Sequence, residues 1–104
     1  MNSFASTLGL GCWAFGGEYW KEQSHRESVG TIRKALEEGI NRFDTAAAYG
    51  NGRSEQIVGQ QLKRVRDSVT IATKGLYHPP EDMEAGIEKS LRRLLTDRID
   101  IYYI

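Results

Sequence analysis

Three polar side chains stand where apolar stretches of the sequence predict the ends of neighbouring strands. Asp44 ends one such stretch, Lys74 ends the next, and Tyr49 follows Asp44 by five residues. Active sites of parallel α/β architectures form at the carboxyl ends of strands, and neighbouring strands lie about 4.8 Å apart. A carboxylate and an ammonium at corresponding strand ends can therefore meet, with the phenol folded back over them.

The chemistry that this trio predicts is general acid catalysis on a carbonyl oxygen. Free tyrosine titrates at about pH 10, and a nearby positive charge lowers the pKa of a phenol because it favours the phenolate. Lys74 could supply that charge, and Asp44 would hold the ammonium in place beside Tyr49. The alternative is a structural ion pair without chemistry.

The elements that must position these residues alternate in type along the chain. Four apolar stretches predict strands, and they cover Leu8–Gly11, Ile40–Asp44, Val69–Lys74 and Ile99–Ile104. Between them, apolar residues recur at helical spacing, and Ser54 is expected to cap the second helix. The order β-α-β-α-β-α-β predicts an α/β fold with parallel strands joined by right-handed crossovers.

Length, charge and cysteine content narrow the classes of protein. The chain has 104 residues, with 14 basic and 14 acidic side chains. Nucleic-acid binding relies on clustered basic residues, so the even balance of charge favours a small ligand and no nucleic acid. The lone Cys12 cannot form an intrachain disulfide, and it is expected to be a small core or loop residue rather than a nucleophile.

The amino terminus has neither a basic region nor an apolar region typical of a secretory signal. No apolar run approaches the roughly 20 residues that a membrane span needs. These features predict a cytoplasmic protein without membrane contact.

A longer pattern resembles a known family. The stretch GINRFDTAAAYGNGRSEQIVG at 39–59 resembles the aldo-keto reductase signature, with its Asp, a Tyr five residues later, and a Glu followed by an apolar pair and Gly. Leu8–Trp13 is similar to the first barrel strand of that family, and Ile71–Lys74 to the strand that bears its catalytic lysine. Ser90–Ile104 resembles the helix and strand that lead to its catalytic histidine.

The resemblance implies a partial TIM (β/α)8 barrel, roughly its first half, as a single incomplete unit over residues 1–104. A closed barrel of this kind needs about 250 residues. The implied activity is that of an oxidoreductase that reduces aldehydes or ketones to alcohols with NADPH, with NADH as a possible cofactor.

The resemblance also implies roles for particular residues. Tyr49 is the implied proton donor, Lys74 activates it, and Asp44 pairs with Lys74. The positions that match those near the nicotinamide are Gly11, Cys12, Trp13 and Asp44. Trp13 and Trp20 could form an aromatic wall for the substrate, or they could be packing residues. No metal site is implied.

One catalytic residue of the family has no counterpart here. The family's histidine follows directly after the strand that in this chain ends at Ile104, and neither His25 nor His78 matches that position. The 104-residue chain alone is therefore expected to be inactive. A missing carboxyl-terminal half, or self-association, is expected to cover its open strand edges. The alternative function is a regulatory or interaction module that binds the cofactor without turnover.

Overall fold

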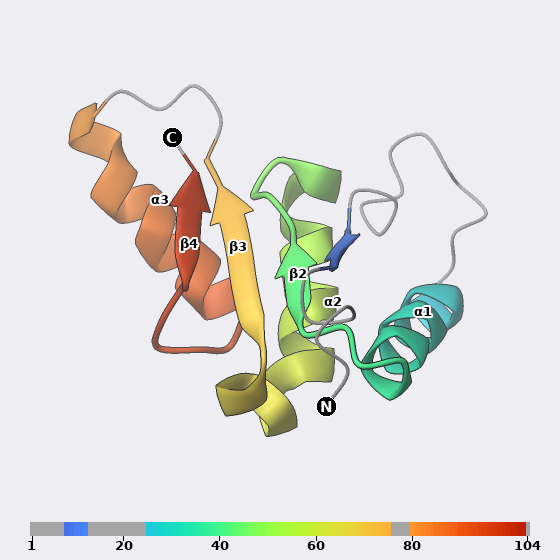
Figure 1. The fold of residues 1–104 in the computed structure, drawn as a ribbon. Coiled ribbons are helices and arrows are strands. Elements are labelled where there is room, and N and C mark those ends of the chain that lie inside the picture. The colour runs from blue at the N-terminus through green and yellow to red at the C-terminus, as the bar shows by residue number, and fades with distance from the viewer. Residues whose placement is uncertain (1–7, 13–24, 76–79, 104) are drawn as a thin grey trace.

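The computed structural model describes residues 8–12, 25–75 and 80–103. In this part of the chain, strands and helices alternate in the predicted order (Figure 1). The strands are β1 (Gly9–Gly11), β2 (Arg42–Asp44), β3 (Thr70–Lys74) and β4 (Ile101–Tyr103). The helices are α1 (His25–Glu37), α2 (Arg53–Leu62) and α3 (Pro80–Arg93), and 3₁₀ segments cover Tyr49–Gly52 and Lys63–Ser68.

The four strands form one parallel sheet in the order β1-β2-β3-β4. Each strand pairs with the one before it in sequence, and a helical segment lies between each pair, so the predicted α/β order is confirmed. The register sets Asp44 beside Gly11 on one side and Ala72 on the other, and it sets Lys74 beside Tyr103.

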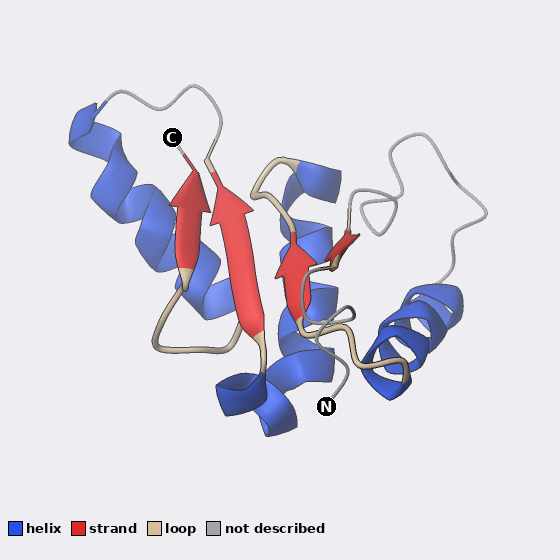
Figure 2. Ribbon diagram, viewed as in Figure 1, coloured by secondary structure: helices blue, strands red, loops and turns tan. Residues whose placement is uncertain are grey.

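The two faces of the sheet differ in character, because successive side chains of a strand point to opposite faces. Phe43, Ile71 and Thr73 are fully buried and lie on the face that α2 covers, since Phe43 and Ile71 belong to one core cluster with residues of α2 and Thr73 donates a hydrogen bond to Glu55 of α2. Figure 2 shows α2 and α3 on that side of the sheet. We call the other side the open face. Arg42, Asp44, Lys74 and Tyr103 lie on it and are partly or largely exposed, and the fully buried Ala72 lies among them.

The hydrophobic core lies between the sheet and its helices. Its buried members are Cys12, Ile32, Ala35, Phe43, Ile57, Val58, Leu62, Val69, Ile71 and Leu94. This cluster fixes which face of the sheet is covered, and so it leaves the charged strand residues on the open face. No helix in the described part of the chain is long and apolar enough to cross a bilayer.

The start of α2 differs from the sequence expectation. Gly52, in a left-handed conformation (φ 95°), precedes α2, and no side chain caps the helix, so the predicted cap role of Ser54 is wrong. The Ser54 side chain is fully buried instead, and its hydroxyl donates a hydrogen bond of 2.7 Å to the carbonyl of Cys12. It also lies 2.7 Å from the hydroxyl of Thr45. Ser54 therefore links the residues that follow β1 and β2 by hydrogen bonds, and it does not cap the start of α2.

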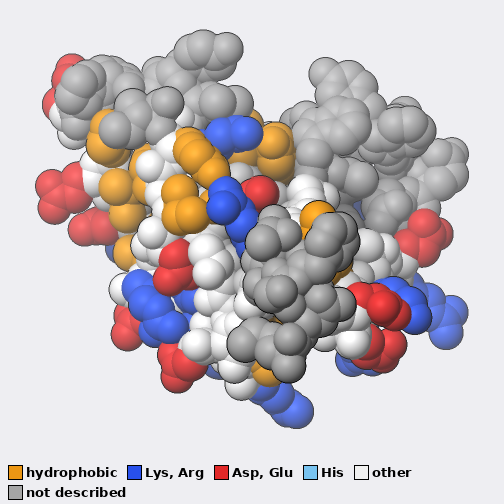
Figure 3. All heavy atoms as spheres, in the orientation of Figure 1, with side chains coloured by type: hydrophobic (Ala, Val, Ile, Leu, Met, Phe, Trp, Pro, Cys, Tyr) orange, Lys and Arg blue, Asp and Glu red, His pale blue; other side chains and the backbone are white. Residues whose placement is uncertain are grey.

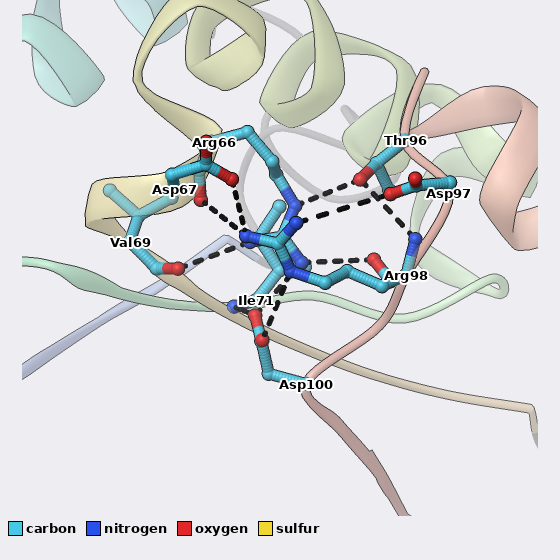
Figure 4. Close-up of polar contacts among 8 residues, drawn as sticks. All are labelled: Arg66, Asp67, Val69, Ile71, Thr96, Asp97, Arg98 and Asp100. Atoms are coloured by element: carbon cyan, nitrogen blue, oxygen red, sulfur yellow. Dashed lines mark hydrogen bonds and ion pairs between the residues drawn. The ribbon is translucent and has the colours of Figure 1, made fainter.

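Arg66 fastens the amino ends of β3 and β4 together (Figure 4). Its guanidinium donates hydrogen bonds to Thr96 Oγ1 at 2.9 Å, to the Arg98 carbonyl at 2.9 Å and to Asp100 Oδ2 at 2.8 Å. The same carboxylate oxygen accepts the backbone N–H of Ile71 at 2.8 Å. Burial alone would raise the pKa of Asp100, but the Ile71 N–H and the Arg66 guanidinium outweigh it and lower that pKa. This cluster lies at the opposite end of β3 from Lys74 and serves the fold.

Candidate active site

Tyr49 and Lys74 meet at the carboxyl edge of the sheet. The ammonium nitrogen of Lys74 lies 5.3 Å from the centroid of the Tyr49 ring, which is within the range of a cation–π contact. Lys74 ends β3, and Tyr49 begins the 3₁₀ segment after β2. The structure thus brings together two of the three residues that the sequence nominated for catalysis.

The loop between Asp44 and Tyr49 is held against β3 by its backbone. The N–H of Thr45 donates to the carbonyl of Ala72 at 2.8 Å, and the N–H of Ala47 donates to the carbonyl of Lys74 at 3.0 Å. Parallel pairing therefore continues beyond the end of β2, and the loop follows β3 as far as Lys74. This continuation is what delivers the Tyr49 ring to the ammonium.

A sharp turn after Tyr49 then leads the chain into α2. Gly50, Asn51 and Gly52 all adopt positive φ angles, of 62°, 56° and 95°. Left-handed backbone costs glycine little, and asparagine tolerates it better than most residues. The turn lets α2 start directly behind the strand end, so Tyr49 stays at the edge of the sheet.

Asp44 takes a different partner from the one expected. Its carboxylate Oδ1 lies 3.3 Å from Nε of Arg42, and the part of the chain that the structure describes shows no ion pair within 4.0 Å between Asp44 and Lys74. The register explains this, since Asp44 lies beside Ala72, and Lys74 is two residues further along β3, which is roughly 6.6 Å. The Asp44–Lys74 pair stays a prediction.

Arg42 completes a polar network on the open face. Its Nη2 donates a hydrogen bond of 2.5 Å to the hydroxyl of Tyr103, so the guanidinium contacts both Asp44 and a residue of β4. The space-filling view of this side shows basic side chains beside an acidic one near its upper middle, next to apolar side chains (Figure 3). Sequence reasoning overlooked Arg42, although strand alternation places it on the same face as Asp44.

Cys12 lies in the core. The residue is fully buried, and its thiol donates a weak hydrogen bond of 3.5 Å to the carbonyl of Leu10. Burial raises the pKa of the Cys12 thiol to about 12, and the nearby charge of Asp44 acts in the same direction. A thiol with such a pKa is protonated at neutral pH, which agrees with the expectation of a core thiol rather than a nucleophile. The buried position of Cys12 does not support its predicted role as a cofactor contact.

Gly11 offers room for a ligand. It lies beside Asp44 in the register, and a Cβ atom built at Gly11 would meet nothing within 4 Å. A planar group such as a nicotinamide ring could approach the backbone there, so the residues at this edge fit the cofactor that the resemblance implies. Trp13, Trp20 and His78 lie outside the described residues. Residues 8–12, 25–75 and 80–103 contain no cluster of three His, Cys, Asp or Glu side chains that could hold a metal ion.

A second buried network supports the site from behind, and sequence reasoning did not find it. Glu55 is fully buried; its carboxylate accepts a hydrogen bond of 2.7 Å from the Thr73 hydroxyl and one of 2.6 Å from Nε of Arg93. In the sequence, Glu55 stands out only as the Glu of the signature-like stretch at 39–59. Its partner Arg93 lies 38 residues away in the sequence, so no local sequence pattern could predict that the two residues pair. The network joins α2, β3 and α3 directly beneath Lys74.

Comparisons with known proteins concern the family and the fold of the chain. The sequence model of the Aldo/keto reductase family matches residues 7–104. The chain is similar to the aldo-keto reductase YhdN of Bacillus subtilis (strain 168), with 42% identity in an alignment that covers 96% of this chain and 34% of that protein. It is also similar to the NADH-specific methylglyoxal reductase of Escherichia coli (strain K12), with 38% identity in an alignment that covers 93% of this chain and 37% of that protein.

The fold has close counterparts among solved structures. The crystal structure of an aldo-keto reductase from Klebsiella pneumoniae in complex with NADPH superposes with a TM-score of 0.78 at 33% identity, over 90% of this chain and 33% of that one. The chain thus spans about a third of the length of the relatives that it matches. Together with the four parallel strands, this confirms the expected partial barrel.

Proposed function

Because this chain belongs to the aldo/keto reductase family, we propose that it forms the part of a nicotinamide-dependent carbonyl reductase that carries the proton donor. The substrates are aldehydes or ketones, and the products are alcohols. The observation that carries this proposal is the approach of the Lys74 ammonium to 5.3 Å from the centroid of the Tyr49 ring. Both residues lie at the carboxyl edge of the strands, where parallel α/β folds do their chemistry.

The proposed reaction adds a hydride and a proton across a carbonyl group. A nicotinamide cofactor held beside Gly11 and Asp44 would be the source of the hydride for the carbonyl carbon. The Tyr49 hydroxyl donates its proton to the carbonyl oxygen, so that C=O becomes CH–OH. The Lys74 ammonium stabilises the phenolate that is left, because opposite charges attract strongly where water is excluded. Water then returns a proton to Tyr49.

The cofactor that we propose is NADPH, with NADH as the alternative. NADPH is the ligand named for the Klebsiella pneumoniae structure, whereas the Escherichia coli relative is named as NADH-specific. The open space beside Gly11 and Asp44 is the part of this chain that would receive the nicotinamide ring. Comparing kcat/KM for the two cofactors at equal aldehyde concentration decides between them.

We further propose that the 104 residues alone do not catalyse the reaction. Their sheet has four strands, whereas the closed barrel has eight, so β1 and β4 each keep an unpaired edge in this sheet. The remaining strands would come from a longer chain or from association with another copy. Light scattering on the pure 104-residue chain, together with an activity assay, tests this. A folded monomer with full reductase activity contradicts it.

The decisive test of the proton donor is Tyr49→Phe in the complete protein, followed by loss of NADPH absorbance with an aromatic aldehyde. We expect turnover to fall by a factor on the order of 100 or more, with the fold and cofactor binding preserved. Tyr102→Phe is the matched control, because it removes the same hydroxyl from the helix-covered face of β4. A rate that survives in Tyr49→Phe refutes the assignment. Cofactor binding without turnover in the unchanged protein favours the regulatory module instead.

A further inference from the structure

Arg93 lies between the strand that carries Lys74 and the turn that follows Tyr49. It is the last residue of α3, and its Nε donates a hydrogen bond of 2.6 Å to the fully buried Glu55 carboxylate of α2. The other oxygen of that carboxylate accepts the Thr73 hydroxyl at 2.7 Å, and Thr73 directly precedes Lys74 in β3. One carboxylate therefore joins Arg93 to the strand that ends at Lys74.

The same arginine side chain packs against the turn after Tyr49. A Cβ atom built at Gly52 would lie 2.6 Å from Cδ and 3.0 Å from Nε of Arg93, so the arginine side chain contacts the Gly52 backbone directly. Gly52 is buried, and its φ of 95° closes the turn that leads from Tyr49 into α2. Nη2 of Arg93 also donates a hydrogen bond of 3.4 Å to the hydroxyl of Ser90, which holds the guanidinium on its own helix. Arg93 therefore contacts the turn from a fixed position.

The turn needs such a support, because backbone pairing with β3 ends before Tyr49. In the described part of the chain, the last backbone hydrogen bond from this loop to β3 runs from the Ala47 N–H to the Lys74 carbonyl. The N–H of Tyr49 donates within the loop instead, at 3.2 Å to the carbonyl of Ala46. A shift of the turn would thus move the phenol relative to the ammonium, and a misplacement of about 1 Å can lower a rate about 100-fold.

We propose that Arg93 is a positioning residue, which sets the Tyr49 ring against the Lys74 ammonium from the helix-covered side of the sheet. Its contact with Glu55 fixes the guanidinium relative to β3, and its contact with Gly52 keeps the turn in place. This inference rests on the proposed function, because it concerns the same proton donor. Arg93 acts through the turn and needs no contact with the substrate.

The experiment measures the first turnover of the complete protein, with NADPH bound beforehand and an aromatic aldehyde then added. We expect Arg93→Ala to lower this rate about 10- to 100-fold per folded molecule, because misplaced groups act on the chemical step. The Kd for NADPH, measured by its fluorescence, and KM for the aldehyde should stay within about threefold, since Arg93 contacts neither molecule. Arg93→Lys keeps Cδ on the turn and a cation for Glu55, so it should restore most of the rate.

Gly52→Ala tests the same contact from the other side. The new Cβ atom displaces the Arg93 side chain, so the single change should lower the first-turnover rate as well. In the Arg93→Ala background the new Cβ atom meets a shortened side chain, so Gly52→Ala should add little further loss, because changes at residues in contact are not additive. The backbone strain of alanine at φ 95° is present in both backgrounds and cancels from the comparison.

Arg92→Ala is the matched control, because Arg92 is the exposed neighbour in α3, and its rate should equal that of the unchanged protein. An unchanged rate per folded molecule in Arg93→Ala assigns Arg93 a merely structural role and overturns the proposal. An equal loss in Arg93→Lys overturns it too, as do losses that add fully in the Gly52→Ala/Arg93→Ala variant.

A folding defect in Arg93→Ala would have its own cause, since Glu55 is then left as a buried charge without its partner. The double variant Glu55→Gln/Arg93→Ala removes that charge and takes the place of Arg93→Ala with the same expected loss of rate and the same condition for rejection. Absence of turnover in the unchanged protein refutes the proposed function instead.

Discussion

Gly59→Ala is expected to destabilise the protein, although alanine is the better helix former. Gly59 lies within α2, where the end of α3 packs closely against it. A Cβ atom at Gly59 would lie 2.5 Å from the backbone carbonyl carbon and oxygen of Leu94. These are backbone atoms, so they cannot move aside by a change of rotamer. The two segments must separate, or the new methyl group must distort one of them.

Two opposing effects decide the size of the change. Helix propensity favours alanine over glycine by about 1 kcal/mol in a helix interior. Overpacking of a close contact costs about 1–3 kcal/mol, and sometimes more. A contact of 2.5 Å against backbone belongs at or above the upper end of that range. The net expectation is a loss of about 2 kcal/mol in the free energy of unfolding.

Gly30→Ala provides the matched control, because Gly30 lies in α1 and a Cβ atom there would meet nothing within 4 Å. Only helix propensity acts at that position, so we expect a gain of about 0.5–1 kcal/mol. Urea unfolding of both variants, followed by circular dichroism, measures the two effects in one protein. Equal changes in stability for Gly59→Ala and Gly30→Ala would refute the reasoning, because they would mean that the approach of α2 to Leu94 is not close.

Three other expectations follow from side-chain contacts. Arg66→Leu should lower the free energy of unfolding by about 1–2 kcal/mol, because it removes the hydrogen bonds to Thr96, to the Arg98 carbonyl and to Asp100. The exposed Arg64→Leu should change it by less than about 0.5 kcal/mol in the same urea assay. Because the pKa of Asp100 is lowered in the folded state, its stabilising effect is present above the ordinary aspartate value of 3.8 and is lost as the pH falls through the folded value. Asp100→Asn should therefore flatten the acid limb of the stability curve, and an unchanged limb would count against the effect. Cys12, whose pKa is raised by burial to about 12, should react with iodoacetamide only after unfolding, and mass spectrometry of native and urea-treated samples checks this on the single thiol of the chain.

The order of elements could be predicted from sequence because it depends on local patterns. A run of β-branched residues predicts the strand at Thr70–Lys74, and apolar residues at helical spacing predict the helix at Arg53–Leu62. The alternation of strands and helices along the chain then predicts a parallel sheet. The rule that active sites lie at strand ends then sufficed to bring Lys74 and Tyr49 together.

The side-chain partners could not be predicted in the same way, because they depend on register. Whether Asp44 pairs with Lys74 or with Arg42 is decided by which residue of β3 lies beside it, and Ala72 occupies that place. Nothing in the local sequence states that register. The burial of Ser54 was missed for a related reason, since its hydroxyl contacts a carbonyl 42 residues earlier in the chain rather than its own helix.

The hydrogen bond from the Ala47 N–H to the Lys74 carbonyl has a consequence for how such a protein can change during evolution. Because main-chain atoms tie the Tyr49 loop to the Lys74 strand, the side chains at 47 and 48 are not what holds Tyr49 beside Lys74. Variation at those two positions can therefore change the surface of this edge while Tyr49 and Lys74 stay together.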